Sequence, residues 1–217
     1  MGVRHIYLVR HAQREPVAGP DAYGPGLTLL GWKQAHLTAR RLSTVKIDVI
    51  YTSSLRRAME TARIIALEFE NIPIRPSQLL WECIPAIPDY ALEWHKKHEH
   101  VDPDTIRLPA EMKPWVGLWG EDTTIKEIEE GFAQAQAAWE KYFIPARGKD
   151  RNDIIVCHGN LMRYFVMRAL KVPAEAWNNT DLYNCCINEI IIKNDGKIML
   201  LSHNDNGHLP DEMKTLS

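Results

Sequence analysis

The apolar run inside "DIIVCHGN", residues 153–160, strongly limits what this chain can fold into. Four consecutive apolar residues without polar alternation are typical of a central parallel strand that is covered on both faces. The rest of the sequence supplies the cover, because strand-like and helix-like segments follow one another along it. The predicted order is strand, helix, strand, helix, strand, insertion, helix, strand, helix and a final hairpin. This order indicates an α/β fold, a three-layer sandwich in which helices cover both faces of a mostly parallel central sheet.

Local signals bound the individual elements. Thr28 is a good N-cap for a helix that ends near Ser43, and "TTIKE" offers a capping box from Thr124 to Glu127. Asn-Asp-Gly at 194–196 is a turn signal between the last two strands. The predicted strands cover residues 3–10, 47–53, 72–80, 153–157, 185–192 and 197–203, and the predicted helices cover residues 28–43, 54–70, 123–143 and 161–170.

Residues 83–121 differ from the rest of the chain. They hold five of the thirteen prolines and three of the seven tryptophans and show no sustained periodicity. We interpret them as an inserted cap or lid. The 217 residues suit one domain, 1–217, that carries this insertion.

Composition excludes several classes of protein. The formal net charge is −2 with no basic stripe, which argues against a nucleic-acid partner. No apolar stretch approaches the ~20 residues that a membrane span needs, so we expect no membrane segment. The cysteines form no CxxC pair, which predicts reduced thiols in a cytoplasmic protein, with the adjacent pair on opposite faces of a strand. The four cysteines are Cys83, Cys157, Cys185 and Cys186.

Charged and polar residues gather where predicted strands end. Arg10 and His11 end the first strand, and His158 ends the apolar run. Ligands bind beyond the carboxyl ends of strands in such sheets, so both histidines are expected to face one crevice. Arg57 begins the helix after another strand and can reach the same place. The helix that follows His158 adds oriented N–H groups that favour anions.

This combination predicts a site for a phosphoryl group. Arginine offers a planar fork that matches phosphate oxygens, and a neutral imidazole can attack phosphorus. Positive charge then stabilises the transferring group. The reaction also needs an acid for the leaving oxygen, and Glu82, at the end of "QLLWE", is the best-placed carboxylate.

The same segments carry a family resemblance. "LVRHAQ", "LTLLGWKQA", "TSSLRRAMETA", "LLWE" and "VCHGN" resemble, in order, motifs of the histidine phosphatase superfamily, the phosphoglycerate-mutase-like proteins. "LLWECIPAIPD" and "GHLPDEMKT" resemble its mitochondrial serine/threonine-protein phosphatase branch. The alignment selects Arg57 over Arg56. Ala12 replaces the glycine of the first motif, and "ECIPAIP" replaces a segment that the mutases carry.

The resemblance implies roles for the strand-end residues. His11 would be the phosphohistidine nucleophile and Glu82 the proton donor, while Arg10, Arg57 and His158 would hold the phosphate. It also implies a phosphatase without metal or cofactor, acting on a phosphorylated substrate, with phosphoserine or phosphothreonine proteins as one class. Because the first predicted strand begins at residue 3, we do not expect the membrane anchor of that branch, and a mitochondrial location is implied by the resemblance alone.

Alternatives stay open at this point. The chain can instead be a phosphoglycerate mutase, a small-molecule phosphatase or a catalytically inactive binding module. The last strands and the tail can form the edge of a homodimer. Two features of the insertion carry less weight: a histidine cluster that we interpret as a solvated lid segment rather than a metal site, and tryptophans that we expect to pack within the insertion rather than line an entrance. These residues are His95, His98 and His100, with Trp81, Trp94, Trp115 and Trp119.

Overall fold

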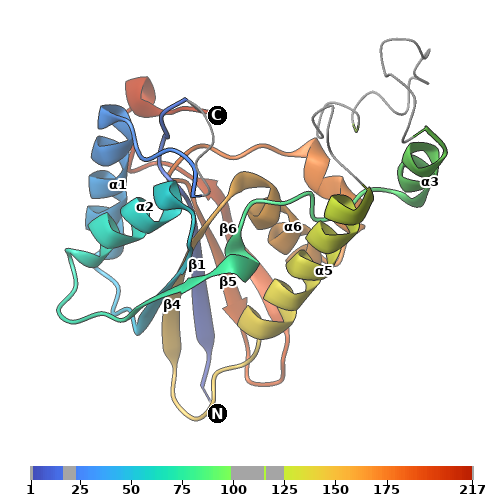
Figure 1. The fold of residues 1–217 in the computed structure, drawn as a ribbon. Helices are drawn as coiled ribbons and strands as arrows, with labels where there is room; N and C mark the ends of the chain where they lie inside the picture. The colour runs from blue at the N-terminus through green and yellow to red at the C-terminus, as the bar shows by residue number, and fades with distance from the viewer. Residues whose placement is uncertain (1, 17–22, 99–114, 116–124, 217) are drawn as a thin grey trace.

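A six-stranded sheet in the order β3-β2-β4-β1-β5-β6 forms the centre of the computed structural model (Figure 1). The structure describes residues 2–16, 23–98, 115 and 125–216. β4 pairs in parallel with both β1 and β2, as its apolar run predicts, and β2 pairs in parallel with β3. β5 and β6 run antiparallel, so the mostly parallel sheet is confirmed with an antiparallel edge.

The predicted helices and strands occur in the predicted order, and their bounds lie close to the predicted ones. The strands are β1 (Arg4–Arg10), β2 (Val49–Ser53), β3 (Ile74–Ser77), β4 (Arg151–Cys157), β5 (Ile187–Ile192) and β6 (Ile198–Asp205). The longer helices are α1 (Leu29–Leu42), α2 (Arg56–Ala66), α3 (Asp89–His98), α5 (Ile125–Tyr142) and α6 (Gly159–Leu170), and short 3₁₀ turns cover Gln78–Leu80, Ala174–Asn179 and Asp211–Met213.

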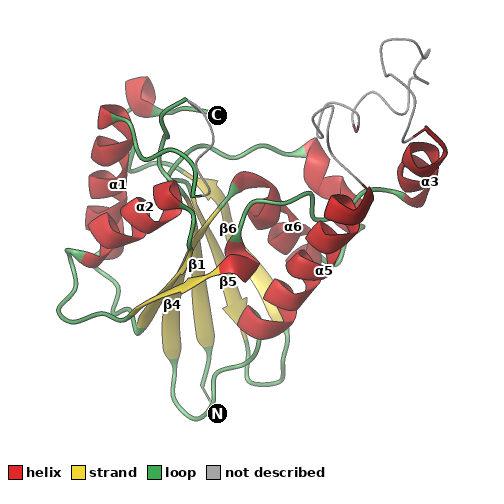
Figure 2. Cartoon of the chain, in the orientation of Figure 1, coloured by secondary structure: helices red, strands yellow, loops and turns green. Residues whose placement is uncertain are grey.

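Helices cover both faces of the sheet (Figure 2). Alternate residues of β4 face opposite layers, as strand geometry requires. Ile154 and Val156 pack with apolar residues of α1 and α2, whereas Ile155 and Cys157 pack with residues of α5 and α6. All four side chains are 0% exposed, which explains why the run has no polar residue. The three-layer prediction is therefore confirmed.

The parallel register brings the ends of β1 and β4 together. Arg10 is aligned with Cys157, so the residues that follow, His11 and His158, leave the same edge of the sheet. α1 begins after Thr28, whose hydroxyl accepts a hydrogen bond from the Gly31 N–H at 2.9 Å, which confirms the predicted cap. The capping box predicted at Thr124 lies outside the described residues.

The insertion is only partly described, and its described part contains a helix that we did not predict. α3 begins after Pro88, whose carbonyl accepts hydrogen bonds from Ala91 and Leu92. Proline is common at the start of a helix, but the prolines of this region led us to interpret it as irregular, so the short periodic segment after Pro88 was missed. Ala91 and Trp115 are buried with residues of α5 and α6. Residues 99–114 and 116–121 of the predicted lid, with His100 and Trp119, lie outside the described residues.

The two adjacent cysteines do not lie in a strand, contrary to the prediction. Cys185 adopts a left-handed backbone, φ 60°, in a turn that precedes β5, and both Cys185 and Cys186 are buried. The Cys185 N–H donates to the Arg10 carbonyl at 3.1 Å, so this turn closes over the end of β1. All four cysteines are free thiols. In the described ranges, no helix is both long enough and apolar enough to span a bilayer.

Gly31 allows α1 to approach the loop after β1. A Cβ at this position would lie 2.1 Å from the backbone oxygen of Gln13. We therefore expect Gly31→Ala to lower the free energy of unfolding by about 2–4 kcal/mol, since backbone on both sides must move. Lys33→Ala, an exposed change in the same helix, is the control and should change it by less than about 0.5 kcal/mol. Urea denaturation measures both. Equal stability of Gly31→Ala and wild type would contradict the close approach.

Candidate active site

His11 follows β1 directly, and its side chain is 3% exposed. Its backbone is fixed on both sides. The His11 N–H donates to the Cys157 carbonyl at 3.0 Å, and the His11 carbonyl accepts from Nδ2 of Asn184 at 3.0 Å. The Ala12 N–H donates to Oγ1 of Thr61 at 3.0 Å. The end of β1 is thus tied to β4, to α2 and to the turn before β5.

The hydrogen bonds of the His11 ring define its tautomer. Nδ1 lies 2.8 Å from the Ala12 carbonyl, which can only accept, so Nδ1 carries the proton. Nε of Arg57 donates to Nε2 of His11 at 3.2 Å, so Nε2 presents a lone pair. The imidazole is therefore neutral, with its lone pair on Nε2.

The surroundings keep both histidines neutral. Burial lowers the pKa of His11 well below its ordinary value of 6.5, and Arg57 and then Arg10 lower it further, while the Ala12 carbonyl opposes them. Burial also lowers the pKa of His158 well below 6.5, followed by the effects of His11, Arg57 and Arg10. The imidazolium is unfavourable here because it loses hydration and lies among other cations.

His158 lies beside His11, as the sequence predicted. It caps α6 from the end of β4 and is 0% exposed. The two ring centroids lie 5.1 Å apart and the rings are tilted by 60°. Nε2 of His158 forms a 2.8 Å hydrogen bond with Oγ of Ser53, the last residue of β2. Three adjacent strands therefore end in this one cluster.

Arg10 extends from the end of β1 beneath the start of α6. Its side chain is buried and donates to the Leu182 carbonyl, and Nη1 lies 4.0 Å from Oδ1 of Asp181. A Cβ on residue 159 would lie 3.3 Å from Nε of Arg10, so Gly159 leaves room for the guanidinium. Arg10 and Arg57 thus place two guanidinium groups around the histidine pair.

Glu82 contacts the first turn of α6, the helix that begins directly after His158. Its Oε1 accepts from the Asn160 N–H at 3.2 Å. The preceding residue, Trp81, holds the segment in place: its Nε1 donates to Oγ of Ser54 at 2.7 Å, and its carbonyl accepts from Nε2 of Gln134 at 2.9 Å. Two elements far apart in the sequence therefore position this carboxylate.

Opposing effects act on the Glu82 carboxyl. The Glu82 residue as a whole is exposed to solvent, whereas its carboxyl group is surrounded by protein. The protein limits the hydration of the carboxylate and so raises the pKa of Glu82. Arg10, Arg57 and Arg163, in that order, and then the Asn160 N–H, act against this rise. Because the crowding dominates, the group holds a proton more readily than a free glutamic acid does.

Several side chains of the site were missed by sequence reasoning. Ser53 bonds to His158, Thr61 and Asn184 fix the backbone around His11, and Arg163 approaches Glu82. Arg163 donates to the Thr180 carbonyl at 2.5 Å and lies over the Trp177 ring at 4.8 Å. The sequence could have indicated Arg163, because it follows "CHGN" closely and lies four residues, about one helical turn, after Gly159 on α6.

The residues predicted for the site lie together in the structure. Their arrangement presents an unprotonated imidazole nitrogen, two guanidinium groups, a second neutral histidine and a carboxyl group with a raised pKa, a set suited to an anionic group that undergoes transfer. Within the described residues no cluster of histidine, cysteine and carboxylate side chains has metal-binding geometry. In the insertion, His98 instead stacks on Trp94 and bonds to its carbonyl at 2.7 Å.

The depressed histidine pKa values predict a pH dependence of stability. Unfolded histidine titrates near 6.5, whereas His11 and His158 resist protonation in the fold, so the unfolded chain binds more protons below that pH. We expect the free energy of unfolding to fall below about pH 6.5, by up to ~1.4 kcal/mol per pH unit for each histidine. Urea denaturation from pH 8 to about pH 5 measures this slope. His11→Gln should flatten it, and exposed His36→Gln should not; an unchanged slope in His11→Gln would contradict this origin.

Comparisons of the sequence with a family model and with curated proteins agree on one family. The family model of the histidine phosphatase superfamily (branch 1) matches residues 6–206. The chain is 32% identical to the mitochondrial serine/threonine-protein phosphatase PGAM5 of Rattus norvegicus, over 99% of this chain and 67% of that protein. It is also 32% identical to the Homo sapiens protein of the same name, over 99% of this chain and 66% of that one. The chain thus spans about two thirds of these relatives.

Solved structures share the fold. A phosphoglycerate mutase from Plasmodium falciparum superimposes with a TM-score of 0.58 at 26% identity, covering 97% of this chain and 96% of that one. The Bacillus stearothermophilus protein YhfR superimposes with a TM-score of 0.66 at 21% identity, covering 94% and 98% of the two chains.

Proposed function

This chain belongs to the histidine phosphatase superfamily (branch 1), and we propose that it hydrolyses phosphomonoesters without a metal through a phosphohistidine at His11. The observation that carries the proposal is the hydrogen bonding of the His11 ring. Nδ1 is held by the Ala12 carbonyl, and Nε2 points its lone pair toward Arg57. A neutral imidazole fixed in this tautomer is a competent nucleophile for phosphorus.

In the first step, Nε2 of His11 bonds to phosphorus and the ester P–O bond breaks. Protonated Glu82 gives its proton to the leaving oxygen, which departs as an alcohol. The raised pKa of Glu82 supports this role, because an acid must hold its proton until the bond breaks. An arriving phosphoryl oxygen can take the N–H that Arg57 donates to Nε2, and this frees the nucleophile.

Arg10, Arg57 and His158 hold the phosphoryl group in this proposal. Guanidinium groups match the oxygens of a phosphoryl group and stabilise charge as it develops. His158 is neutral, and Ser53 fixes the orientation of its ring. The N-terminus of α6 adds backbone donors on the same side.

In the second step, Glu82 acts as a base. Its carboxylate takes a proton from water, the water oxygen bonds to phosphorus, and the P–N bond to His11 breaks. Phosphate leaves, His11 returns to the neutral ring, and Glu82 is protonated again. The same group thus serves as acid and then as base, so one carboxyl suffices for the cycle.

Phosphoserine or phosphothreonine in proteins is the substrate class that we propose. The support is the similarity at 32% identity to relatives named serine/threonine-protein phosphatases. The Glu82 segment also departs from that of the mutases, since "CIPAIP" follows the glutamate. A hydrolase has to admit water after the first step, whereas a mutase returns the phosphoryl group to bound substrate.

A substrate panel tests this proposal. We expect kcat/KM for phosphoserine and phosphothreonine peptides to exceed that for phosphosugars and nucleotides, with release of phosphate in each case. A higher kcat/KM for a small phosphorylated metabolite would make the protein a small-molecule phosphatase. Interconversion of 3- and 2-phosphoglycerate faster than phosphate release would make it a mutase and overturn the hydrolase.

A further inference from the structure

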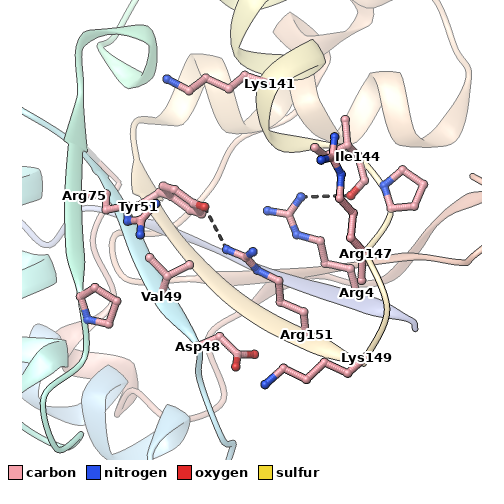
Figure 3. Close-up of a pocket in the computed structure, with 13 residues that line it drawn as sticks. Arg4, Asp48, Val49, Tyr51, Arg75, Lys141, Ile144, Arg147, Lys149 and Arg151 are labelled. Carbon is pink, nitrogen blue, oxygen red and sulfur yellow. Dashed lines mark hydrogen bonds between the residues drawn. The ribbon is translucent and has the colours of Figure 1, made fainter. Parts of the chain in front are cut away.

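A second cationic cavity lies at the opposite end of the sheet from the histidine cluster. It measures about 420 Å³ and opens beside the beginnings of β1, β2 and β4, where the catalytic groups follow the ends of the same strands. Figure 3 shows its side chains around a common hollow. β1 extends from Arg4 at the cavity to Arg10 at the catalytic crevice, which separates the two by about 20 Å at ~3.3 Å per residue.

Positive charge dominates this cavity. Six cationic side chains line it, and two carboxylates, Asp48 at the wall and Asp153 beneath it, leave a surplus of four positive charges. The chain as a whole has a formal net charge of −2, so this surplus is local. The six cations are Arg4, Arg75, Lys141, Arg147, Lys149 and Arg151.

Some of these cations form a rigid base. Arg4 is buried and donates to Asp153 at 2.7 Å and to the Tyr142 carbonyl at 2.6 Å. Arg151 donates to Asp153 at 2.7 Å and to the Tyr51 hydroxyl at 2.9 Å. The arrangement around the buried Asp153 therefore holds two guanidinium groups in fixed positions.

Other cations of the cavity are exposed and uncommitted. The guanidinium groups of Arg75 and Arg147 and the ammonium group of Lys149 make no hydrogen bond or ion pair with the described part of the chain. Arg75 lies on β3 in register with Tyr51 of β2. Arg147 and Lys149 come from the loop before β4 and lie on the opposite side of the hollow from Arg75 (Figure 3). A ligand with several anionic groups can contact them together.

The wall between the cations is apolar. Val49, Pro73, Ile144, Pro145 and Ala146 contribute carbon surface beside the charges. A volume of about 420 Å³ lies within the range of small-molecule sites, about 300–1,000 Å³, which combine apolar walls with a few charged groups. Arginine in particular matches phosphate oxygens with paired N–H donors. These features favour a compact organic molecule with two or more phosphate groups over a bare ion.

We propose that this cavity binds an organic polyphosphate, such as a nucleoside triphosphate, at a site separate from the catalytic crevice. The fixed guanidinium groups of Arg4 and Arg151 form its base, and the free cations Arg75, Arg147 and Lys149 close on the phosphates. The apolar wall contacts the organic part. Binding at this cavity does not depend on which substrate the phosphatase takes, because no residue of the proposed catalytic set lines the cavity.

Calorimetric titration with β,γ-methylene-ATP, which resists loss of its terminal phosphate, tests the site. The variant is Arg75→Ala/Arg147→Ala, which leaves the Asp153 arrangement intact. The matched control is Arg63→Ala/Lys193→Ala, which removes two exposed cations elsewhere. Hydrolysis of p-nitrophenyl phosphate by each variant reports on the fold and on the catalytic crevice.

We expect the wild-type protein and the control to bind the probe with equal Kd, and the cavity variant to bind at least about tenfold more weakly with unchanged kcat/KM. Equal binding by the cavity variant would place the probe in the catalytic crevice and overturn the proposal. Equal losses of affinity in the cavity variant and the control would show that the probe binds by general charge attraction, which would also overturn the proposal. Displacement of the probe by an oligoglutamate peptide at lower concentration than by tripolyphosphate would overturn the ligand class.

Discussion

Replacement of His11 by alanine is expected to lower kcat for p-nitrophenyl phosphate by at least about a thousandfold, because it removes the atom that bonds to phosphorus. Alanine also removes the acceptor of the Arg57 N–H, but the backbone bonds to Cys157 and Asn184 remain. The loss should therefore occur in a folded protein. Steady-state kinetics and circular dichroism on the same sample separate the two effects.

The control for this variant is His36→Ala. His36 is exposed on α1 and lies outside the site, so its removal should leave kcat within about twofold of wild type. Hydrolysis by His11→Ala at the wild-type rate would exclude His11 as nucleophile. A partial rate that returns when imidazole is added would support the role, because free imidazole can occupy the position of the missing ring.

Replacement of Glu82 by glutamine is expected to lower kcat by about a hundredfold to ten-thousandfold for a phosphoserine peptide. Glutamine keeps the shape and can still accept from the Asn160 N–H, but it carries no transferable proton. Nitrophenolate leaves without much help, so the first step should suffer less with p-nitrophenyl phosphate. The ratio of the two losses measures the acid role directly.

The sign of the pH effect gives a second reading of the Glu82→Gln variant. The pKa of Glu82 is raised, and the acid form is needed in the first step, so kcat/KM should fall as pH rises through that pKa. The variant should lack this basic limb. Exposed Glu68→Gln, the matched control, should keep both the rate and the limb. Equal losses for the peptide and the nitrophenyl ester would argue for a structural role of Glu82 instead.

Much of the fold could be predicted because its signals are local or periodic. The apolar run of β4 required cover on both faces, and Thr28 marked the start of α1 through its hydroxyl. The failures have a different origin. Cys185 looked like part of a strand, yet the contact of its N–H with the Arg10 carbonyl, from a distant part of the chain, fixes a left-handed turn.

The site was predictable where its residues follow strands. Arg10, His11 and His158 meet because β1 and β4 pair in parallel, and the predicted mostly parallel sheet already placed the ends of both strands at one edge. The supporting side chains carry no such signal. Asn184 reaches the His11 carbonyl across 173 residues of sequence, and Ser53 contacts His158 across 105. Such contacts appear only when the chain is folded.

The cavity of Arg4 and Arg151 was also invisible in the sequence. Its cations come from β1, β3, α5, β4 and the loop before β4, and they are spread along the chain without a basic stripe. Only the common starting edge of the parallel strands gathers them. The two ends of the sheet thus differ in their charged groups: neutral histidines lie among arginines at one end, and free cations lie at the other.

The most direct test of a phosphohistidine at His11 is to trap the phosphorylated enzyme. Wild-type protein is mixed with p-nitrophenyl phosphate, quenched in alkali within one turnover, digested and analysed by mass spectrometry. We predict one phosphoryl group on the peptide that contains His11, stable in alkali and lost in acid, enriched in Glu82→Gln and absent from His11→Ala. Phosphate release at the normal rate with no such phosphopeptide, or with the group on His158, would contradict the assignment of the nucleophile.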